Sequence, residues 1–535
     1  MSLRKLTGIC GALVFFFGVV LCRVYWVCTD TAYAKSAGAQ TVFETELPRA
    51  RGNFYDRNAN LLTGSKKRWY ALCIPGDSSY AGLFPYVTFA AQSELYEKRN
   101  TTAPFLIEVE REIKGSGTYT FASAQRYLPL PIAAHLLGYL DGEGHGVAGL
   151  ESAYDDILST TYSANTIACT TSAQGRLLTG TEPQITTTEQ GSGAGVELTL
   201  DANLQRACEG IALETMTRGC IVVMDTATGE VLASVSMPLF DPENIGKSIR
   251  ANDTSLINRP LASFSAGSVF KVVLAAAAYR AGLDWFSYEC TGGVSVGDQT
   301  FRCALGRAHG EVNLRGALEQ SCNCYFVELG KLLGAQKVLQ AAQDFGFGQE
   351  TAVAAGLKSA AGVLPEDTAL DSEAQLAMFS FGQGALTVTP LQITAMTNAI
   401  ANGGLLLAPR FVRGMMDADT KTLTEKAAAA QNTRACEPAT AHILQSMLVS
   451  VVEDGIGGEA APDQGGAGGK TGTAQTGQYD EEGEEPLNYW FTGFWPAENP
   501  QYTITVLQDG TLDPEVSSAA IFARVANALF VYKSG

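Results

Sequence analysis

The longest apolar stretch of the chain lies near its N-terminus. After two basic residues, the run from Leu6 to Cys22 is apolar, and Arg23 separates it from a shorter apolar stretch that ends at Cys28. A helix of about 20 apolar residues spans a bilayer, and an arginine near its end can reach the headgroups. Because basic residues before a span favour the cytoplasmic side, the pattern predicts a cytoplasmic tail (1–5), a single-pass anchor in the cell membrane (6–27) and an extracytoplasmic remainder.

A cleaved signal peptide is the competing interpretation of this segment. Ala32-Tyr33-Ala34 has the small-x-small form of a cleavage site. The apolar run is long for a signal peptide, so the pattern favours a retained anchor. Both interpretations export the rest of the chain.

The region after the anchor mixes short apolar runs with polar loops. Arg51 to Asn58 is typical of a short strand between turns, and Asp141 to Gly146 is typical of an ordinary loop rather than a cation site. The stretch from Ser159 to Gly195 is rich in serine, threonine and glycine, which indicates a domain boundary. A chain of 535 residues is expected to form two or three domains. We therefore predict a mixed domain over 28–195 and a second domain over 196–535.

Strand signals open the second region. Val196 to Leu200 alternates apolar and polar residues with a period of two, and Asp201 follows as the cap of a predicted helix. Two apolar runs, Cys220 to Asp225 and Glu230 to Ser236, are joined by Thr226 to Gly229. This pattern predicts a β-hairpin.

Two further strands are predicted near the C-terminus, at Asn488 to Trp495 and at Tyr502 to Leu507. Helical patterns fill the chain between the two pairs of strands. One of them begins with an N-cap and a proline, Thr389-Pro390, and ends at Gly403-Gly404. Strands at both ends with helices between them predict an α+β fold, in which an antiparallel sheet with flanking helices unites distant parts of the chain.

Composition narrows the function classes. Apolar residues make up 46% of the chain and charged residues 17%, as in folded domains with apolar cores. The net charge is −18 and no basic stripe is present. Since phosphate binding needs clustered lysine and arginine, no nucleic-acid partner is expected.

The twelve cysteines are scattered, without the spacing of a disulfide framework. Cys290 and Cys303 flank a glycine-rich stretch, Thr291 to Arg302, that could form a hairpin, so this pair is either a disulfide or two free thiols. CxxC, HExxH and clustered histidines are absent. The sequence therefore predicts neither a metal site nor a cofactor.

Candidate chemistry begins with Ser268 and Lys271. Residues 268–281 are almost wholly apolar, which predicts a buried helix with Ser268 at its start, near unpaired N–H groups and the positive end of the helix dipole. Lys271 follows on the same face. Burial and the dipole are expected to lower the pKa of its amine, which can then take the proton of the Ser268 hydroxyl. The alternative is a serine N-cap beside an ordinary solvated lysine.

A second motif, Ser321-Cys322-Asn323, lies within Gly316 to Gly330, which has a helical pattern. Ser321 offers a hydroxyl and Asn323 an amide. These groups suit proton relay and the binding of a substrate carbonyl, although the triplet alone is not specific.

A third motif, Lys470-Thr471-Gly472, starts a predicted strand after a glycine-rich run. Lys470 and Thr471 can hold a carboxylate, and Gly472 lets a substrate backbone approach closely. The backbone N–H of Thr473, together with that of Ser268, can form an oxyanion hole.

In this order the three motifs resemble the active site of the class B penicillin-binding proteins, which are membrane-anchored D,D-transpeptidases that cross-link peptidoglycan. The resemblance covers most of the chain beyond the anchor. The other segments that carry it are Arg51-Gly52, Tyr55-Asp56-Arg57, Gly149-Leu150-Glu151, Leu200-Asp201 with Gln205, Val223-Met224-Asp225, Thr228-Gly229-Glu230-Val231-Leu232-Ala233, Asn258-Arg259, Gly382-Gln383-Gly384, Thr389-Pro390-Leu391-Gln392, Trp490-Phe491 and Gly493-Phe494.

The resemblance implies a penicilloyl-serine transferase domain that follows a non-catalytic pedestal of the dimerisation type. Ala266 departs from the family pattern, which has proline at this position, but alanine can adopt the same backbone angles. The implied site consists of the nucleophile Ser268, the base Lys271, the relay and binding residues Ser321 and Asn323, and the carboxylate and oxyanion residues Lys470, Thr471 and Thr473.

The resemblance also implies the partners. Peptidoglycan stem peptides are the expected substrates, with a D-Ala-D-Ala donor and an amine acceptor. β-Lactams are the expected covalent inhibitors, and a membrane glycosyltransferase is the expected protein partner. Glycosyltransferase activity is not expected in this chain, because the region before residue 196 lacks the acidic motifs of that domain.

Two rival functions stay open at the level of the sequence. Hydrolysis of the acyl group would make the protein a D,D-carboxypeptidase or a β-lactamase, although the middle motif is Ser-Cys-Asn rather than the Ser-Asp-Asn of class A β-lactamases. A β-lactam sensor or a non-catalytic scaffold for wall synthesis is the other rival. A sensor needs a signalling domain, whereas the predicted cytoplasmic tail is very short.

Overall fold

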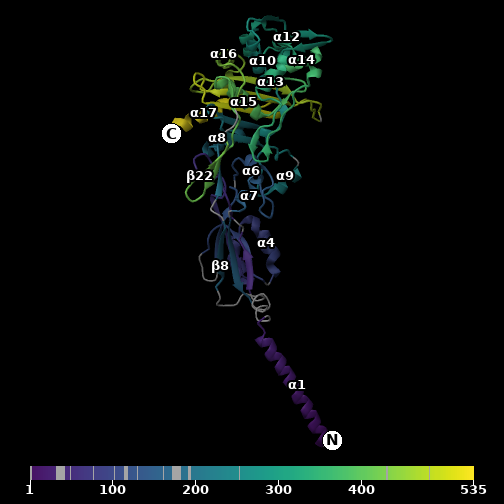
Figure 1. Ribbon diagram of the computed structural model, residues 1–535, viewed down its shortest axis with the longest axis vertical. Helices are drawn as coiled ribbons and strands as arrows, with labels where there is room; N and C mark the ends of the chain where they lie inside the picture. Colours follow the sequence, from purple (N-terminus) through teal and green to yellow (C-terminus); the bar gives the residue numbers. More distant parts are fainter. Residues whose placement is uncertain are drawn as a thin grey trace. The chain divides into compact units, whose positions relative to one another are not determined.

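The computed structural model describes residues 3–31, 42–47, 50–75, 77–101, 103–113, 119–128, 130–160, 162–171, 182–190, 194–251, 253–428, 432–480 and 482–534 (Figure 1). Residues 32–34, where a signal-peptide cleavage site was considered, lie outside these ranges.

Contacts divide the chain into two compact units. Unit 1 comprises Met1–Arg51, Gly64–Arg126 and Thr161–Gly191, and unit 2 comprises Gly52–Thr63, Tyr127–Thr160 and Ser192–Gly535. Two segments that precede residue 195 thus make their contacts within unit 2. The predicted domain boundary at that residue remains a prediction.

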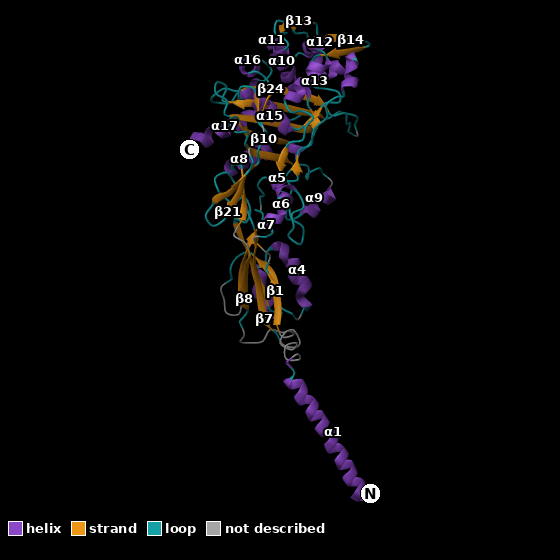
Figure 2. Ribbon diagram, viewed as in Figure 1, coloured by secondary structure: helices purple, strands orange, loops and turns teal. Residues whose placement is uncertain are grey.

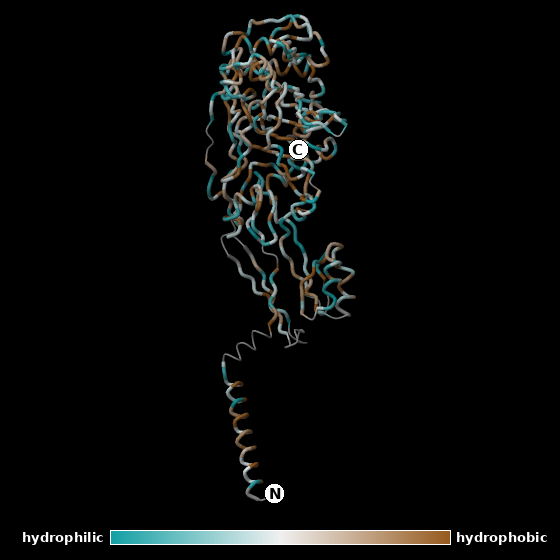
Figure 3. Tube along the Cα trace, turned by 90° about the vertical axis from the view of Figure 1, so that its right-hand side faces the viewer, coloured by the Kyte–Doolittle hydropathy of each residue, from teal (hydrophilic) through white to brown (hydrophobic). Residues whose placement is uncertain are grey.

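The first helix, α1 (Leu3–Thr29), contains a stretch from Lys5 to Thr29 that is long and apolar enough to cross a membrane. Its described side chains are exposed, and hydrophobic colours recur along it in Figure 3. Burying such an apolar surface in lipid is favourable. The helix therefore fits the predicted membrane anchor.

The rest of unit 1 contains two sheets in the described residues. In one, β4 (Lys66–Cys73) lies between β5 (Phe105–Val109) and β6 (Tyr119–Gln125), and the short helices α3 (Asp77–Leu83) and α4 (Gln92–Glu97) contribute to the same apolar cluster. In the other, β7 (Tyr162–Thr170) pairs with β1 (Val42–Glu46), β2 (Ala50–Arg51) and β8 (Gln184–Gln190).

Unit 2 is built on an antiparallel five-stranded sheet. Its spatial order is β11 (Val231–Met237), β10 (Gly219–Asp225), β26 (Tyr502–Thr511), β25 (Leu487–Trp495) and β24 (Gly468–Gln475). The hairpin and the two C-terminal strands predicted from the sequence are confirmed. The sheet unites distant parts of the chain, as the α+β prediction required.

Helices cover both faces of this sheet (Figure 2). On one face, α8 (Ala202–Thr215) and α17 (Ser518–Ser534) share an apolar cluster with strand residues such as Ile221 and Phe491. On the other face, α15 (Pro390–Ala401) and α16 (Pro438–Glu453) share a cluster with Trp490. Because both faces are buried, the strands are apolar at successive positions rather than at alternate ones.

A mainly helical part of unit 2 adjoins the second face and holds the first two motifs, while the third motif lies on β24. Its helices are α10 (Lys271–Arg280), α11 (Leu314–Glu319), α12 (Asn323–Leu333), α13 (Ala335–Asp344) and α14 (Glu373–Ser380). Two small sheets, β13 (Ser287–Cys290) with β16 (Gly310–Asn313) and β14 (Gly293–Val296) with β15 (Gln299–Arg302), form an extension between α10 and α11. The latter pair confirms the predicted hairpin.

The remaining described α-helices and strands of unit 2 are short. They are α5 (Ala134–Leu137), α6 (Gly149–Ala153), α7 (Asp155–Leu158), α9 (Ile245–Ala251), β3 (Phe54–Tyr55), β9 (Ala194–Leu198), β12 (Phe264–Ser265), β17 (Ala352–Ala354), β18 (Leu357–Lys358), β19 (Thr387–Val388), β20 (Leu405–Leu406), β21 (Val412–Asp417), β22 (Thr422–Lys426) and β23 (Thr433–Arg434).

Two helix starts follow the local rules read from the sequence. The Asp201 carboxylate caps α8 by accepting hydrogen bonds from the N–H groups of Asn203 and Leu204. Thr389 and Gln392 form a reciprocal capping box at the start of α15, with Pro390 in its first turn. Both predicted caps are confirmed.

Candidate active site

Ser268 lies in a short 3₁₀ helix, η5 (Gly267–Phe270), that continues directly into α10. The sequence predicted a single α-helix from residue 268, whereas the α-helix begins at Lys271. Gly267 has a positive φ of 62°, which glycine adopts without strain. Val269 and Phe270 are fully buried while Ser268 is only partly buried, so this turn anchors the serine at the edge of the core.

The turn packs against β24, which is the edge strand of the central sheet. A Cβ atom added at Gly267 would lie 2.6 Å from the carbonyl oxygen of Thr473, and one added at Gly472 would lie 2.9 Å from Cγ1 of Val269. Side chains do not fit at either position. Gly472 was expected to admit a substrate backbone, and the structure adds a different reason for glycine there, which is the packing of η5.

The backbone of Thr473 faces the turn. Its carbonyl oxygen accepts a hydrogen bond of 3.4 Å from Nε2 of Gln383, on the side of the strand away from β25. In an antiparallel strand the N–H and C=O groups of one residue point to the same edge. The N–H of Thr473 therefore also points toward η5, where an oxyanion hole with Ser268 was predicted.

The Lys271 amine is fully buried and enclosed by the middle motif. It donates hydrogen bonds to the backbone oxygen of Ser321 (2.8 Å), to the Ser321 hydroxyl (3.1 Å) and to Oδ1 of Asn323 (2.6 Å). Among the described residues, the Lys271 amine makes these three hydrogen bonds. It makes none to the hydroxyl of Ser268, which lies one turn earlier. Burial lowers the pKa of Lys271 to about 7, against the opposing effect of nearby thiol groups.

The middle motif interrupts a helix that the sequence predicted to be continuous. The apolar pattern indicated helix from Gly316 to Gly330, but α11 ends at Glu319 and α12 begins at Asn323. Between them Ser321 adopts a φ of 54°, which is unusual for a residue with a side chain. This break is what allows the carbonyl and the hydroxyl of Ser321 to reach Lys271.

Lys470 is fully buried on β24 and donates to the backbone oxygen (3.1 Å) and the hydroxyl (3.2 Å) of Thr471. Burial, and then the charge of Lys271, lowers the pKa of Lys470 well below its ordinary value. Thr471 is partly buried and Thr473 is exposed. Two amines thus lie beneath the strand, and its two threonines are accessible from solvent.

Three residues without an assigned role in the sequence analysis hold the turn in place. The Gly267 N–H donates to the Gly382 oxygen at 2.8 Å, and Gln383 reaches Thr473 as described above. On the other side, Nε1 of Trp490 donates to the Ser265 oxygen at 3.0 Å. Gly382-Gln383-Gly384 is one of the motifs that carry the family resemblance. Its two glycines were the sequence signal that another backbone segment, here that of Gly267, packs closely against it.

The cysteines of the predicted hairpin are both free thiols, and their sulfur atoms are 3.7 Å apart. The sequence left open whether Cys290 and Cys303 form a disulfide or remain free thiols, and in the structure they are free thiols.

Comparisons with known proteins show what the chain is similar to. Residues 219–529 match the family model described as "Penicillin binding protein transpeptidase domain". Stage V sporulation protein D of Bacillus subtilis is 30% identical over 417 residues, which cover 75% of this chain and 63% of that protein. Peptidoglycan D,D-transpeptidase MrdA of Acinetobacter baumannii is 27% identical over 532 residues, which cover 86% of this chain and 77% of that protein.

A solved structure extends the likeness to the fold. The crystal structure of penicillin binding protein 3 from Mycobacterium tuberculosis in complex with aztreonam matches with a TM-score of 0.65 at 26% identity, over 92% of this chain and 97% of that one. The chain spans less than two thirds of the length of the sporulation protein that it matches. Since the family model covers more than half of the chain and the motifs meet in one site, the protein belongs to the class B penicillin-binding proteins.

Proposed function

We propose that the protein is a serine D,D-transpeptidase that cross-links peptidoglycan stem peptides and is acylated by β-lactams. The observation that carries the proposal is the buried Lys271 amine, whose pKa is lowered to about 7 and which lies one turn after Ser268 and against Ser321 and Asn323. An amine of this kind is partly neutral at neutral pH and can act as a base.

In the proposed reaction, the neutral Lys271 amine takes the proton of the Ser268 hydroxyl while Oγ attacks the carbonyl carbon of the D-Ala-D-Ala bond. The N–H groups of Ser268 and Thr473 stabilise the negative oxygen that develops. The proton then passes, through Lys271 and the Ser321 hydroxyl, to the nitrogen of the leaving D-Ala. An ester bond to Ser268 has formed and the amide bond has broken.

The second half of the reaction reverses the roles. An amine of a neighbouring stem peptide attacks the ester carbonyl and loses its proton through the same relay, and the serine hydroxyl is restored. In the first half, Lys470 and Thr471 hold the terminal carboxylate of the donor, because a bound anion favours the charged form of the buried Lys470. A β-lactam acylates the same oxygen, but its leaving amine stays tethered to the acyl group.

The location and domain roles are part of the proposal. α1 anchors the protein in the cell membrane with residues 1–5 in the cytoplasm, and residues 196–535 act outside as the transpeptidase domain. Residues 28–195 form the non-catalytic pedestal, and a membrane glycosyltransferase supplies the glycan strands. The apolar helix α1 carries the basic residues Arg4 and Lys5 in its first turn, which supports this orientation.

Covalent labelling tests the proposal. The detergent-solubilised full chain is treated with a fluorescent penicillin, and the labelled peptide is identified by mass spectrometry. We expect the label on Ser268, and no label on the Ser268→Ala and Lys271→Ala variants. Ser263→Ala, which changes an exposed serine before the same turn, is the matched control and should label normally. Labelling that persists in Ser268→Ala would contradict the proposal.

Two further measurements separate the rival functions. Continuous hydrolysis of a β-lactam by the purified protein would favour a hydrolase. Full complementation of a null strain by Ser268→Ala would favour a scaffold, because a scaffold does not need the nucleophile.

A further inference from the structure

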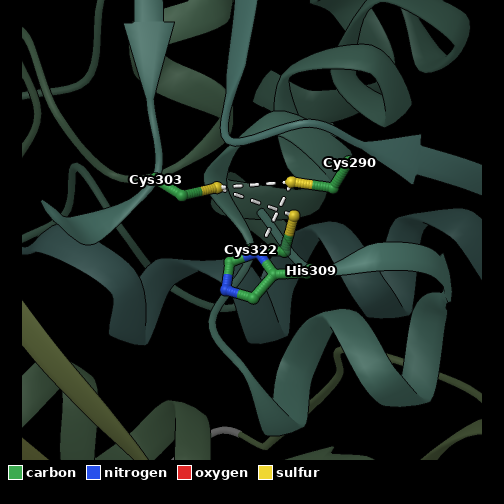
Figure 4. Close-up of side chains that lie close together, drawn as sticks. All are labelled: Cys290, Cys303, His309 and Cys322. Atoms are coloured by element: carbon green, nitrogen blue, oxygen red, sulfur yellow. Dashed lines mark hydrogen bonds between the residues drawn. The ribbon is translucent and has the colours of Figure 1, made fainter. Parts of the chain in front are cut away.

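A cluster of sulfur and nitrogen atoms lies directly behind the middle motif. The Sγ atoms of Cys290, Cys303 and Cys322 and a ring nitrogen of His309 all lie within 4.8 Å of one another (Figure 4). The sequence predicted no metal site, because the four residues follow no CxxC or HExxH spacing. They meet only because the chain folds into the small sheets between α10 and α11.

Each donor comes from a different place in the fold. Cys290 ends β13, Cys303 directly follows β15, His309 directly precedes β16, and Cys322 caps α12. Backbone hydrogen bonds fix the positions of three of them: the His309 N–H donates to the Cys290 oxygen (3.1 Å), and the Cys303 N–H donates to the Gly292 oxygen (3.1 Å). Backbone hydrogen bonds therefore help to position three of the four donors.

Three of the six distances between the donors match the edges of a tetrahedral zinc site. With Zn–S bonds of about 2.3 Å and Zn–N bonds of about 2.0 Å, such a site has edges of about 3.8 Å between sulfurs and about 3.5 Å between sulfur and nitrogen. The structure has 3.7 Å for Cys290–Cys303, 3.8 Å for Cys303–Cys322 and 3.4 Å from Sγ of Cys290 to Nδ1 of His309.

The chemistry of the donors also points to zinc. Three cysteines and one histidine form a common structural zinc set, and thiolates disfavour hard cations such as Ca²⁺ and Mg²⁺. The three cysteines are buried, with exposed fractions of 1%, 3% and 0%, whereas His309 is partly buried. Solvent thus reaches the cluster mainly from the histidine side, which gives an ion a route of entry.

We propose that Cys290, Cys303, His309 and Cys322 bind one Zn²⁺ ion in a closed structural site. On binding, the three thiols release their protons to solvent and neutral His309 coordinates through Nδ1. The Cys324 sulfur lies 3.5 Å from that of Cys303, where its thiol can donate a hydrogen bond to the bound sulfur. With four protein ligands no position remains for water, so the ion positions residues and takes no part in the chemistry.

The site would link the extension of small sheets to the middle motif. Cys322 stands between Ser321 and Asn323, the two residues that enclose the Lys271 amine. Nδ2 of Asn323 donates at 2.9 Å to the oxygen of Arg302, the residue next to Cys303. An ion held by Cys303 and Cys322 therefore fixes the interrupted segment between α11 and α12. Metal content is measured without any activity, so this inference and the proposed function fail separately.

Metal analysis of the full chain tests the site. The protein is purified in detergent without a metal-affinity tag, dialysed against a weak chelator and analysed for zinc by mass spectrometry. We expect about one zinc per chain, and at least a fivefold loss in Cys290→Ser, Cys303→Ser and His309→Gln. Cys208→Ser, which alters another fully buried thiol far from the cluster in the sequence, is the matched control and should keep its zinc.

A second measurement uses the unaltered protein, so that the site can be tested even if the variants fail to fold. Replacing zinc by Co²⁺ should give the visible absorption bands of tetrahedral cobalt bound to thiolates, and a mercurial reagent should release the metal as it reacts with the ligand thiols. A zinc-free protein that gives no such cobalt spectrum would overturn the proposal. So would zinc retained in all three variants, or a disulfide between Cys290 and Cys303 in the native protein, detected as a loss of two mass units.

Discussion

The Lys271 amine lies 2.6 Å from Oδ1 of Asn323, a residue 52 positions further along the chain. This contact, with those to Ser321, surrounds the amine with uncharged oxygen atoms. Such acceptors satisfy the N–H groups without supplying the negative charge that would hold the amine protonated. The effect of burial, which lowers the pKa of the amine, is therefore not offset by a carboxylate among its hydrogen-bond partners.

The acylation rate is expected to follow the protonation of this amine. Because burial lowers the pKa of Lys271 to about 7, the neutral and active form increases as the pH rises through that value. The second-order rate of penicillin acylation should rise by about tenfold per pH unit below about pH 6 and level off above about pH 8. Stopped-flow measurements over this range check it, and a flat profile would show that Lys271 is not the base.

A methyl group at Gly382 is expected to disturb the turn that carries Ser268. Its Cβ would lie 1.9 Å from the Gly267 oxygen, and the φ of 84° at Gly382 is itself unfavourable for alanine. Because the backbone of residue 267 must move, Gly382→Ala should slow acylation by about 100-fold. Gly210→Ala is the control, since nothing lies within 4 Å of its added Cβ in α8 and the change should stabilise that helix by about 1 kcal/mol. Equal acylation rates in both variants would contradict this account.

A buried ion pair ties the segment before Ser268 to the central sheet. Arg259 is fully buried, and its Nε donates at 2.8 Å to Oδ2 of Asp509. Arg259→Met removes the buried positive charge that compensates the Asp509 carboxylate. The change should lower the free energy of unfolding by about 3–5 kcal/mol. Arg218 contacts the same carboxylate with a side chain that is 43% exposed, so Arg218→Met should cost about 1 kcal/mol or less.

Thermal unfolding of the two variants and of Asp509→Asn measures these effects. The double variant Arg259→Met/Asp509→Asn should lose clearly less stability than the sum of the two single changes, because neither charge is then left without its partner. Additive losses would show that the pair is not coupled.

The stability of unit 2 is expected to fall in mild acid because of His135. Burial lowers the pKa of His135 to about 4, while the ring is held by a 2.6 Å hydrogen bond to the Ser255 oxygen and by the edge of Phe240. The folded state therefore takes up the proton less readily than the unfolded chain, whose histidine has a pKa of about 6.5. This contribution to stability is complete above about pH 6.5 and is lost as the pH falls toward 4, by a total of about 3 kcal/mol.

Denaturant unfolding at a series of pH values checks this loss. The His135→Gln variant lacks this titrating group and should not show the loss of stability in acid. The difference in stability between the variant and the unaltered protein should therefore shrink as the pH falls from about 7 to about 4. A constant difference over that range would contradict the assignment to His135.

Much of unit 2 followed from local patterns. The apolar runs that became β10, β11, β25 and β26 have strong strand signals, and Asp201 and Thr389 mark helix starts by side-chain chemistry alone. What local patterns did not reveal was the break at Ser321. The apolar residues of α11 and α12 follow one continuous helical pattern. The backbone nevertheless departs from the helix at Ser321, where its carbonyl oxygen accepts a hydrogen bond from Lys271 of α10.

The cluster of cysteines and histidine escaped prediction for a related reason. Its four members stand at strand ends and a helix cap, so their proximity depends on which strands pair. Likewise the part played by Gln383 and Trp490 depends on β24 being the edge strand. Tertiary pairing, rather than the residues themselves, was the missing information.

The position of β24 at the end of the sheet has a consequence for biosynthesis. This strand reaches the hairpin of β10 and β11 only through β25 and β26, which are the last strands of the chain. A chain still being synthesised already carries Ser268 and Lys271 but lacks the strand against which their turn is packed. The turn that carries Ser268 therefore lacks its packing partner until the chain has been made as far as β26.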